Sequence, residues 1–204
     1  MRDADVRAAL HVLLRHEHAH ELHATRFLNE LDLCGLVRVD VAVINGEFAG
    51  YELKSERDTL ARLPLQVSVY SRVLDRATLV VATTHFDRAR TVVPDWWGII
   101  VARAERGVTE LQWFRRPQRN PDIRAEALVQ LLWRDEVLAE LAARGLDRGI
   151  RRANRCVLWA HLTTNVPISQ LQVLVRERLK HRAGWRADSL PPRGDAGSHS
   201  VATS

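Results

Sequence analysis

Apolar and polar residues alternate most clearly in two short runs, residues 36–44 and 48–53. Alternation of this kind is typical of β-strands, because successive side chains point to opposite faces. Asn45, Gly46 and Glu47 separate the runs, and Asn-Gly is the dipeptide that most readily turns a hairpin. We therefore expect two antiparallel strands. Strict alternation would divide the first strand into two faces, with Val37, Val39, Val41 and Val43 on one and Arg38, Asp40, Ala42 and Ile44 on the other.

The pattern elsewhere predicts an α/β protein. Helical spacing of apolar residues indicates helices at residues 3–30, from about Pro64, and at residues 123–143, 154–162 and 169–180. Compact apolar runs indicate further strands at residues 77–82, 98–102 and 108–114, the last two turned around Glu105, Arg106 and Gly107. A helix between residues 53 and 77 favours a parallel crossover.

These elements suggest three parts: an α/β core over residues 1–116, a helical extension over residues 117–186, and a tail over residues 187–204. The basic, proline-bearing residues 115–121 are the expected linker. The tail is rich in Pro, Gly and Ser without apolar periodicity, so we expect it to be disordered. In residues 92–100, the adjacent Trp96 and Trp97 are expected to cover a core edge, with base stacking as the alternative.

Composition narrows the class of protein. With 204 residues, 46% of them hydrophobic, the chain can bury a core of its own. Its net charge of +5 favours a polyanionic partner, although the many arginines can equally reflect a GC-rich genome. Two distant cysteines, no signal peptide and no long apolar run predict a reduced, cytoplasmic protein without a membrane partner.

Two carboxylates in the hairpin need an explanation, since acidic residues are depleted in strands and rarely buried without a partner. Asp40 and Glu52 lie on neighbouring strands, and Lys54 follows two residues after Glu52. A hard divalent cation such as Mg²⁺ would suit two such carboxylates, and the ammonium of Lys54 would then lie beside a scissile phosphate. The alternative is a structural ion-pair cluster neutralised by Arg38 and Lys54.

This arrangement of an Asp, a strand turn and Glu-Leu-Lys resembles the PD-(D/E)xK nuclease superfamily over roughly residues 27–83. Val39 stands where the signature proline would precede Asp40. Gln66 and Tyr70 match the QxxxY pattern of the RecB-like branch, although residues at this spacing are also ordinary neighbours on a helix. Glu30, which we expect to end the preceding helix, resembles an additional acidic residue of some branches.

The resemblance implies a restriction-endonuclease-like α/β fold and Mg²⁺-dependent hydrolysis of DNA, with Mn²⁺ as a possible substitute. Asp40 and Glu52 would hold the metal, with the Leu53 carbonyl as a third ligand and Glu30 acting through water. Lys54 would orient the nucleophilic water and stabilise the transition state. Gln66 and Tyr70 would position the substrate.

Two further groups of residues are candidates for contacts with nucleic acid. Ser55 and Arg57 follow Lys54 closely enough to reach a phosphate, and a solvated turn is the alternative. Residues 141–162 are faintly similar to SAP-type DNA-binding modules, and a plain helical appendage explains them equally well. The phosphate contacts of such a module would be Arg148, Arg151, Arg152 and Arg155.

Rival functions remain at this stage. His16, Glu17 and His20 satisfy the HExxH pattern of zinc metalloproteases, although a short histidine-rich tract matches this pattern easily by chance. A non-catalytic DNA-binding or repair-accessory protein with the same fold is the main alternative. The sequence leaves open exo- or endonuclease action, DNA or RNA, a homodimer or protein partner, and the choice among repair, restriction and phage-related defence.

Overall fold

The computed structural model describes residues 1–105 and 107–182. Six strands form one mixed sheet whose spatial order, β1-β2-β3-β4-β5-β6, is also the order of the sequence. The outer pairs β1/β2, β2/β3 and β5/β6 are antiparallel, whereas β3/β4 and β4/β5 are parallel. The strands are β1 (Arg26–Leu33), β2 (Val37–Ile44), β3 (Phe48–Lys54), β4 (Arg76–Ala82), β5 (Gly98–Glu105) and β6 (Val108–Arg115).

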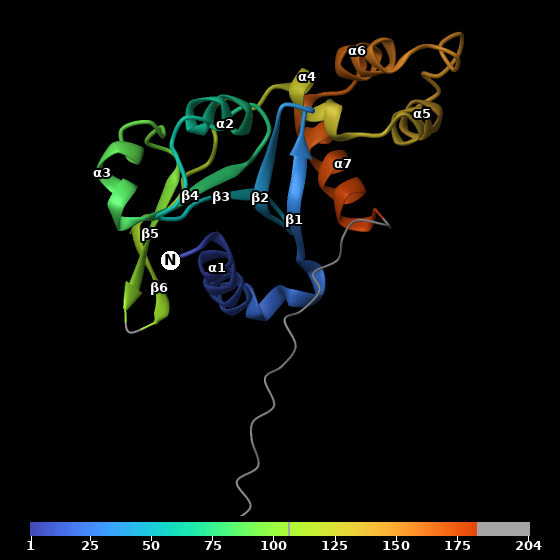
Figure 1. Cartoon of the computed structure of the whole chain (residues 1–204). Helices are drawn as coiled ribbons and strands as arrows, with labels where there is room; N and C mark the ends of the chain where they lie inside the picture. The colour runs from blue at the N-terminus through green and yellow to red at the C-terminus, as the bar shows by residue number, and fades with distance from the viewer. Residues whose placement is uncertain (106, 183–204) are drawn as a thin grey trace, which may run out of the picture.

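Helices cover both faces of the sheet, which confirms the predicted α/β class with a helical C-terminal part (Figure 1). Helix α1 (Asp3–Glu17) packs Val6, Leu10 and Leu14 on one face. Helix α2 (Leu63–Tyr70) packs on the other face and connects β3 to the parallel strand β4, so the expected crossover is present. The remaining helices are α3 (Phe86–Ala89), α4 (Ala125–Leu128), α5 (Arg134–Ala143), α6 (Arg155–Asn165) and α7 (Ile168–His181).

The hairpin around Asn45 is confirmed, but strict alternation along β2 is wrong. Val37 and Val39 lie in the same core cluster as Ala42 and Ile44, while Val41 and Val43 lie in the cluster under α1. The change of face therefore occurs at Asp40. Glu30 lies opposite Asp40 on β1 and has a φ of 56°. The side chains of β1 and β2 both change face at this row, so the pairing register between the two strands is the same before and after it.

The predicted helix over residues 3–30 is too long. Helix α1 ends at Glu17, a short 3₁₀ segment spans Ala19–Ala24, and β1 follows, so Glu30 lies in a strand. The left-handed backbone at Glu30 places Leu28, Leu31 and Leu33 in one core cluster. The helix was predicted from Val6, Leu10, Leu13 and Leu14, which do recur at helical spacing, but these four residues all lie within α1.

The C-terminal helices share the core of the sheet rather than forming a separate one. Leu128, Leu158 and Leu171 belong to the same cluster as the apolar residues of β1, β2 and α2. The predicted helix over residues 123–143 is broken into α4, a 3₁₀ turn (Val129–Leu131) and α5. A new helix begins after Trp133 because the Glu136 carboxylate accepts a hydrogen bond of 2.7 Å from the Trp133 N–H.

The expected linker is anchored on the sheet. Asn120 is buried, and its side-chain amide donates to the carbonyls of Ser71 and Leu74 at 2.8 and 2.7 Å. Asp75, just before β4, binds helix α7: its carboxylate accepts from Gln172 at 2.9 Å and from Arg176 at 3.0 Å. The extension is thus fixed to the start of β4 by polar bonds as well as by apolar packing.

Several sequence expectations concern smaller features. Trp97 is fully buried, as the core interpretation predicts, and stacks on Tyr70 with ring centroids 5.5 Å apart. Cys34 and Cys156 are both free thiols. Within residues 1–105 and 107–182, no helix has the length and apolar character needed to cross a membrane. The predicted disordered tail, residues 187–204, lies outside the described residues.

Candidate active site

Three carboxylates lie in one row across the first three strands. The ladder between β1 and β2 places Glu30 opposite Asp40. The ladder between β2 and β3 ends at Val41 and Tyr51, so Asp40 and Glu52 occupy the next row, where the two strands are no longer paired. The middle of β1 and of β2 and the C-terminal end of β3 thus bring Glu30, Asp40 and Glu52 to one place between α1 and α2.

Glu52 is fully buried and surrounded by hydrogen-bond donors. One carboxylate oxygen, Oε1, accepts from Lys54 Nζ at 2.6 Å and from the Gln66 side-chain amide, and the other accepts from the Tyr70 hydroxyl. Gln66 and Tyr70 are themselves buried, and they come from one face of α2 at an interval of four residues. The QxxxY pattern therefore lies beside Glu52, not on the protein surface. Burial and the Glu52 carboxylate both raise the pKa of Tyr70, so its hydroxyl stays a donor.

Asp40 occupies the gap between β2 and β3. Its Oδ2 accepts a hydrogen bond of 2.8 Å from the main-chain N–H of Leu53, which stands in for the missing ladder bond. Burial raises the pKa of Asp40 to about 7, with Glu52 acting in the same direction. The Leu53 N–H, Arg7 and Lys54 act in the opposite direction. A carboxyl whose pKa is raised by burial and by a neighbouring carboxylate is a common sign of a functional site.

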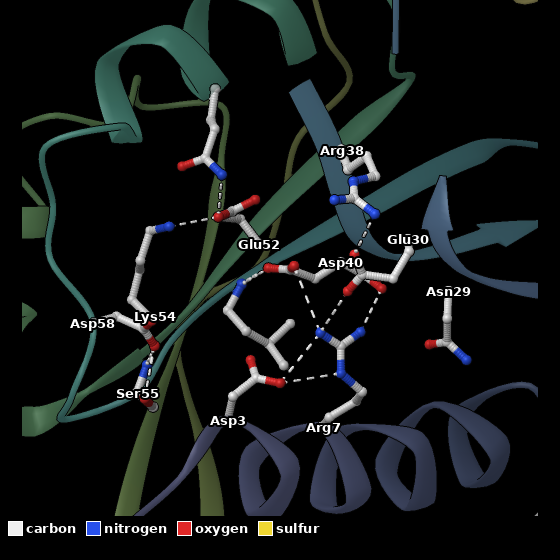
Figure 2. A network of polar contacts seen from close by, with 12 residues as sticks. Asp3, Arg7, Asn29, Glu30, Arg38, Asp40, Glu52, Lys54, Ser55 and Asp58 are labelled. Atoms are coloured by element: carbon white, nitrogen blue, oxygen red, sulfur yellow. Dashed lines mark hydrogen bonds and ion pairs between the residues drawn. The ribbon is translucent and has the colours of Figure 1, made fainter. Parts of the chain in front are cut away.

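Arg7 of α1 approaches Asp40 and Glu30 from the side of the helix, as Figure 2 shows. Its Nη1 donates to the Asp40 carbonyl at 2.7 Å, and its Nη2 lies 3.1 Å from Glu30 Oε1 and 3.6 Å from Asp40 Oδ1. Asp3, one turn earlier on α1, accepts from Arg7 Nε at 3.3 Å. Arg38 lies 3.5 Å from the other oxygen of Glu30.

These groups surround a small cavity of about 190 Å³. Its walls come from α1, β1, β2, β3, the following loop and α2. The lining residues are Asp3, Glu30, Arg38, Asp40, Glu52, Leu53, Lys54, Asp58, Arg62 and Gln66. The lining includes every residue predicted to hold the metal, together with Lys54 and Gln66.

The donor set suits a hard cation, although no three His, Cys, Asp or Glu residues of the described chain are grouped closely enough to hold a metal by themselves. Asp40 and Glu52 offer carboxylate oxygens. Gln66 Oε1 is buried and, within the described residues, has no hydrogen-bond partner. Mg²⁺ is commonly bound through one or two carboxylates and several waters, and an unpaired amide oxygen can accept from such a water. The residues present therefore fit a hydrated Mg²⁺ better than an all-protein cage.

The two residues expected to contact phosphate beyond Lys54 differ in exposure. Ser55 is buried, and both its N–H and its hydroxyl donate to Asp58, at 2.7 and 2.6 Å. It therefore shapes the turn after β3, where it is buried rather than solvated. Arg57 is exposed.

The four arginines predicted to bind phosphate are all exposed: Arg148, Arg151 and Arg152 lie between α5 and α6, and Arg155 is the first residue of α6. Arg151 forms an ion pair of 2.5 Å with Asp147, and the Arg155 guanidinium lies 4.6 Å from the centre of the Trp159 ring. Gly145 and Gly149 have φ values of 70° and 81°, a conformation that favours glycine, so the connecting loop turns sharply twice. We call the exposed set Arg148, Arg151, Arg152 and Arg155 the arginine loop.

The geometry needed for the HExxH pattern is absent. Helix α1 ends at Glu17, so His16 and His20 do not lie on one helical face. Glu17 is engaged elsewhere, because one of its oxygens accepts from Trp113 Nε1 at 3.1 Å and from Arg116 at 2.6 Å. The alternative interpretation of His16, Glu17 and His20 as a zinc protease site is therefore wrong.

The sequence reasoning missed Asp3, Arg7, Asp58 and Arg62, which line or contact the cavity. Asp3 and Arg7 are an ordinary i,i+4 pair on a polar helix surface, and nothing in the local pattern separates them from solvated neighbours. Only the packing of α1 against the β1/β2 row shows that they face the carboxylates.

The fold and the site together define an α/β protein with a mixed six-stranded sheet, flanking helices and a polar, carboxylate-lined cavity at the splayed end of β2 and β3. More particularly, the profile of the family described as Bacteriophage P4 protein cII matches residues 2–197, and the chain belongs to this family. The comparison with curated proteins gave no match.

Two solved structures show a distant similarity. A protein of unknown function from Silicibacter pomeroyi is 23% identical with a TM-score of 0.37, over 64% of this chain and 82% of that one. SfsA from Pyrococcus furiosus, solved in complex with Ca²⁺, is 14% identical with a TM-score of 0.34, over 55% of this chain and 63% of that one. At this level of similarity neither structure says what the present chain does.

Proposed function

We propose that the chain is a metal-dependent nuclease of the PD-(D/E)xK type that hydrolyses phosphodiester bonds of DNA in the cytoplasm. The observation that carries the proposal is the single cavity shared by Asp40, Glu52, Lys54 and Gln66. Asp40 and Glu52 would hold Mg²⁺, with the Leu53 carbonyl as a third ligand and Glu30 acting through water. The metal would supply Lewis-acid stabilisation of the phosphate and lower the pKa of its bound water.

The protein's own residues would do the rest. Lys54, already 2.6 Å from Glu52, would orient the attacking water and stabilise charge on the phosphate, a role that for one such donor is worth about 3 kcal/mol. Gln66 and Tyr70 hold the Glu52 carboxylate in place by their hydrogen bonds. Arg57 and the arginine loop would bind phosphates away from the cleaved bond.

Membership in a family named for a bacteriophage protein supports a phage-related role over general repair or restriction. The second candidate is a non-catalytic DNA-binding protein with the same fold. The exposed arginine loop favours this candidate as much as it favours the nuclease, whereas the carboxylate cavity favours the nuclease alone.

The test is cleavage of linear and circular, single- and double-stranded DNA with Mg²⁺, Mn²⁺ or EDTA, with Lys54→Ala beside the wild type. A nuclease cuts only with metal, and the variant should be slower by about 10²- to 10³-fold while still binding DNA. Circular substrates separate endonuclease from exonuclease action. If both proteins bind DNA and neither cuts it with any metal, the accessory function takes the place of the nuclease.

A further inference from the structure

The guanidinium of Arg7 lies where a cation would be bound. It contacts Glu30 Oε1 at 3.1 Å, Asp40 Oδ1 at 3.6 Å and the Asp40 carbonyl at 2.7 Å. Figure 2 shows Arg7 reaching up from α1 between Asp3 and the two strand carboxylates. Its positive charge offsets the repulsion between acidic groups that the strand register forces into one row.

Arg7 and a divalent cation would compete for the same oxygens. Asp40 Oδ2 already accepts from the Leu53 N–H, so Oδ1 is the Asp40 carboxylate oxygen that is more open to a metal. That oxygen and Glu30 Oε1 are the ones that face Arg7. A divalent cation placed beside them would be repelled by the guanidinium at close range.

Arg7 can leave the strand carboxylates and still keep one ion pair. Its side chain is 21% exposed, and its Nη2 lies 3.2 Å from the carboxylate of Asp3, its i,i+4 neighbour on α1. A planar guanidinium pairs strongly with phosphate through two parallel hydrogen bonds. A nucleic-acid phosphate arriving at the cavity would therefore offer Arg7 a partner in place of Asp40 and Glu30.

We propose that Arg7 is an exchangeable counter-cation: it neutralises Asp40 and Glu30 in the metal-free protein and moves to a substrate phosphate when the divalent cation binds. This inference rests on the proposed function and adds a regulation to it, because metal and nucleic acid then bind with positive coupling. Such coupling is reciprocal, so DNA tightens metal binding as much as metal tightens DNA binding.

Calorimetric titration with Mn²⁺ tests the inference in the full-length protein, alone and with a short phosphorothioate DNA that resists hydrolysis. Removing the charge in Arg7→Gln should tighten Mn²⁺ binding by about tenfold or more without DNA, which is within the usual range of coupling between sites. DNA should tighten Mn²⁺ binding to the wild type by a similar factor and to Arg7→Gln by much less. Arg7→Lys keeps the charge and should stay close to the wild type.

Arg15→Gln is the matched control, since it makes the same change of charge on α1 at a residue whose guanidinium lies over the Phe27 ring. It should leave Mn²⁺ affinity unchanged, and circular dichroism should show all variants folded. If Mn²⁺ binds Arg7→Gln no more tightly than the wild type, Arg7 does not compete with the metal, and the inference fails while the proposed function stands. If Mn²⁺ binds none of the proteins, with or without DNA, both are wrong.

Discussion

The carboxylate of Asp40 accepts a 2.8 Å hydrogen bond from the main-chain N–H of Leu53, thirteen residues later on the neighbouring strand. One side chain thus replaces a ladder bond at the row where β2 and β3 separate, and the separation makes room for the cavity between them. The same carboxylate is a structural element and a candidate metal ligand, so its substitutions must be chosen to keep one role while removing the other.

Asp40→Asn should make the metal-free protein more stable at neutral and alkaline pH. The pKa of this carboxyl is about 3.8 unfolded and about 7 folded, so folding takes up a proton between these values. Stability from this group is therefore greatest below pH 4 and is lost as the pH rises to about 7. Asn can still accept from Leu53 and carries no charge to bury.

Urea unfolding in EDTA from pH 4 to 8 measures this effect. The advantage of Asp40→Asn over the wild type should grow across this range to a few kcal/mol, at about 1.4 kcal/mol for each unit of pKa. Asp95→Asn, at a fully exposed carboxylate, should show no such trend. A constant difference between wild type and Asp40→Asn at all pH values would mean that Asp40 titrates normally.

Glu52 and Lys54 should show strong non-additivity. Glu52→Gln leaves a nearly buried ammonium without its carboxylate, and Lys54→Met leaves a buried carboxylate with two neutral donors. Each change should cost about 3 kcal/mol of unfolding free energy, because it strands a buried charge. The double variant should cost clearly less than the sum, as measured by denaturant unfolding of all four proteins. Strict additivity would argue that the pair is effectively solvated.

Tyr70→Phe should be destabilising, whereas Tyr51→Phe should be nearly neutral. The Tyr70 hydroxyl donates to the buried Glu52 carboxylate, and loss of a hydrogen bond to a charged group costs about 2 kcal/mol. Tyr51 is almost as buried, but its hydroxyl has no comparable bond to a carboxylate within the described residues. Stacking on Trp97 is kept in Tyr70→Phe, so equal melting temperatures for the two variants would show that the hydroxyl contributes nothing.

Asp75→Ala should loosen the helical extension from the sheet. Its buried carboxylate also accepts from the Phe48 N–H at 2.8 Å, so the change leaves that donor and Arg176 unpaired. We expect a loss of about 3 kcal/mol. Hydrogen exchange should then increase in α7 and at the start of β3. Asp122→Ala, at an exposed carboxylate paired with Arg124, is the control and should change neither stability nor exchange.

Removing charge from the arginine loop should reduce the salt dependence of DNA binding. For each arginine that no longer binds a phosphate, the slope of log affinity against log salt falls by about one. Arg148→Gln, Arg152→Gln and Arg155→Gln combined should therefore flatten it by up to about three. Arg88→Gln, Arg90→Gln and Arg119→Gln combined make the same change of net charge at other exposed positions. Equal slopes for the two triple variants would mean that the loop does not bind phosphates specifically.

The hairpin and the crossover could be predicted because local chemistry determines them. Asn45 closes the turn, since its side-chain oxygen accepts from the Glu47 N–H, and a helix between β3 and β4 leaves a parallel pairing as the simple solution. The strand at Glu30 could not be predicted, since its φ of 56° breaks the alternation by which strands are recognised. That left-handed conformation depends on pairing with β2, which is tertiary information.

The site was predicted in part for a related reason. Asp40, Glu52, Lys54 and Gln66 were singled out by their resemblance to a known sequence pattern, and the structure places all four at one cavity. Arg7 belongs to no such pattern, because its role comes from the packing of α1 across the sheet. The break between α4 and α5 was missed because the apolar stripe continues through it while the capping of α5 begins a new helix.

Every strand pairs with its neighbour in sequence, from β1 to β6. Pairing between strands that follow one another in the sequence keeps these contacts local, and short-range contacts favour rapid folding. During synthesis, β1, β2 and β3 can therefore pair as soon as they leave the ribosome, bringing Glu30, Asp40 and Glu52 together early. The bonds of Asp75 to Gln172 and Arg176 form only after α7 has been made. The acidic row would thus be assembled near the start of folding and locked in place near its end.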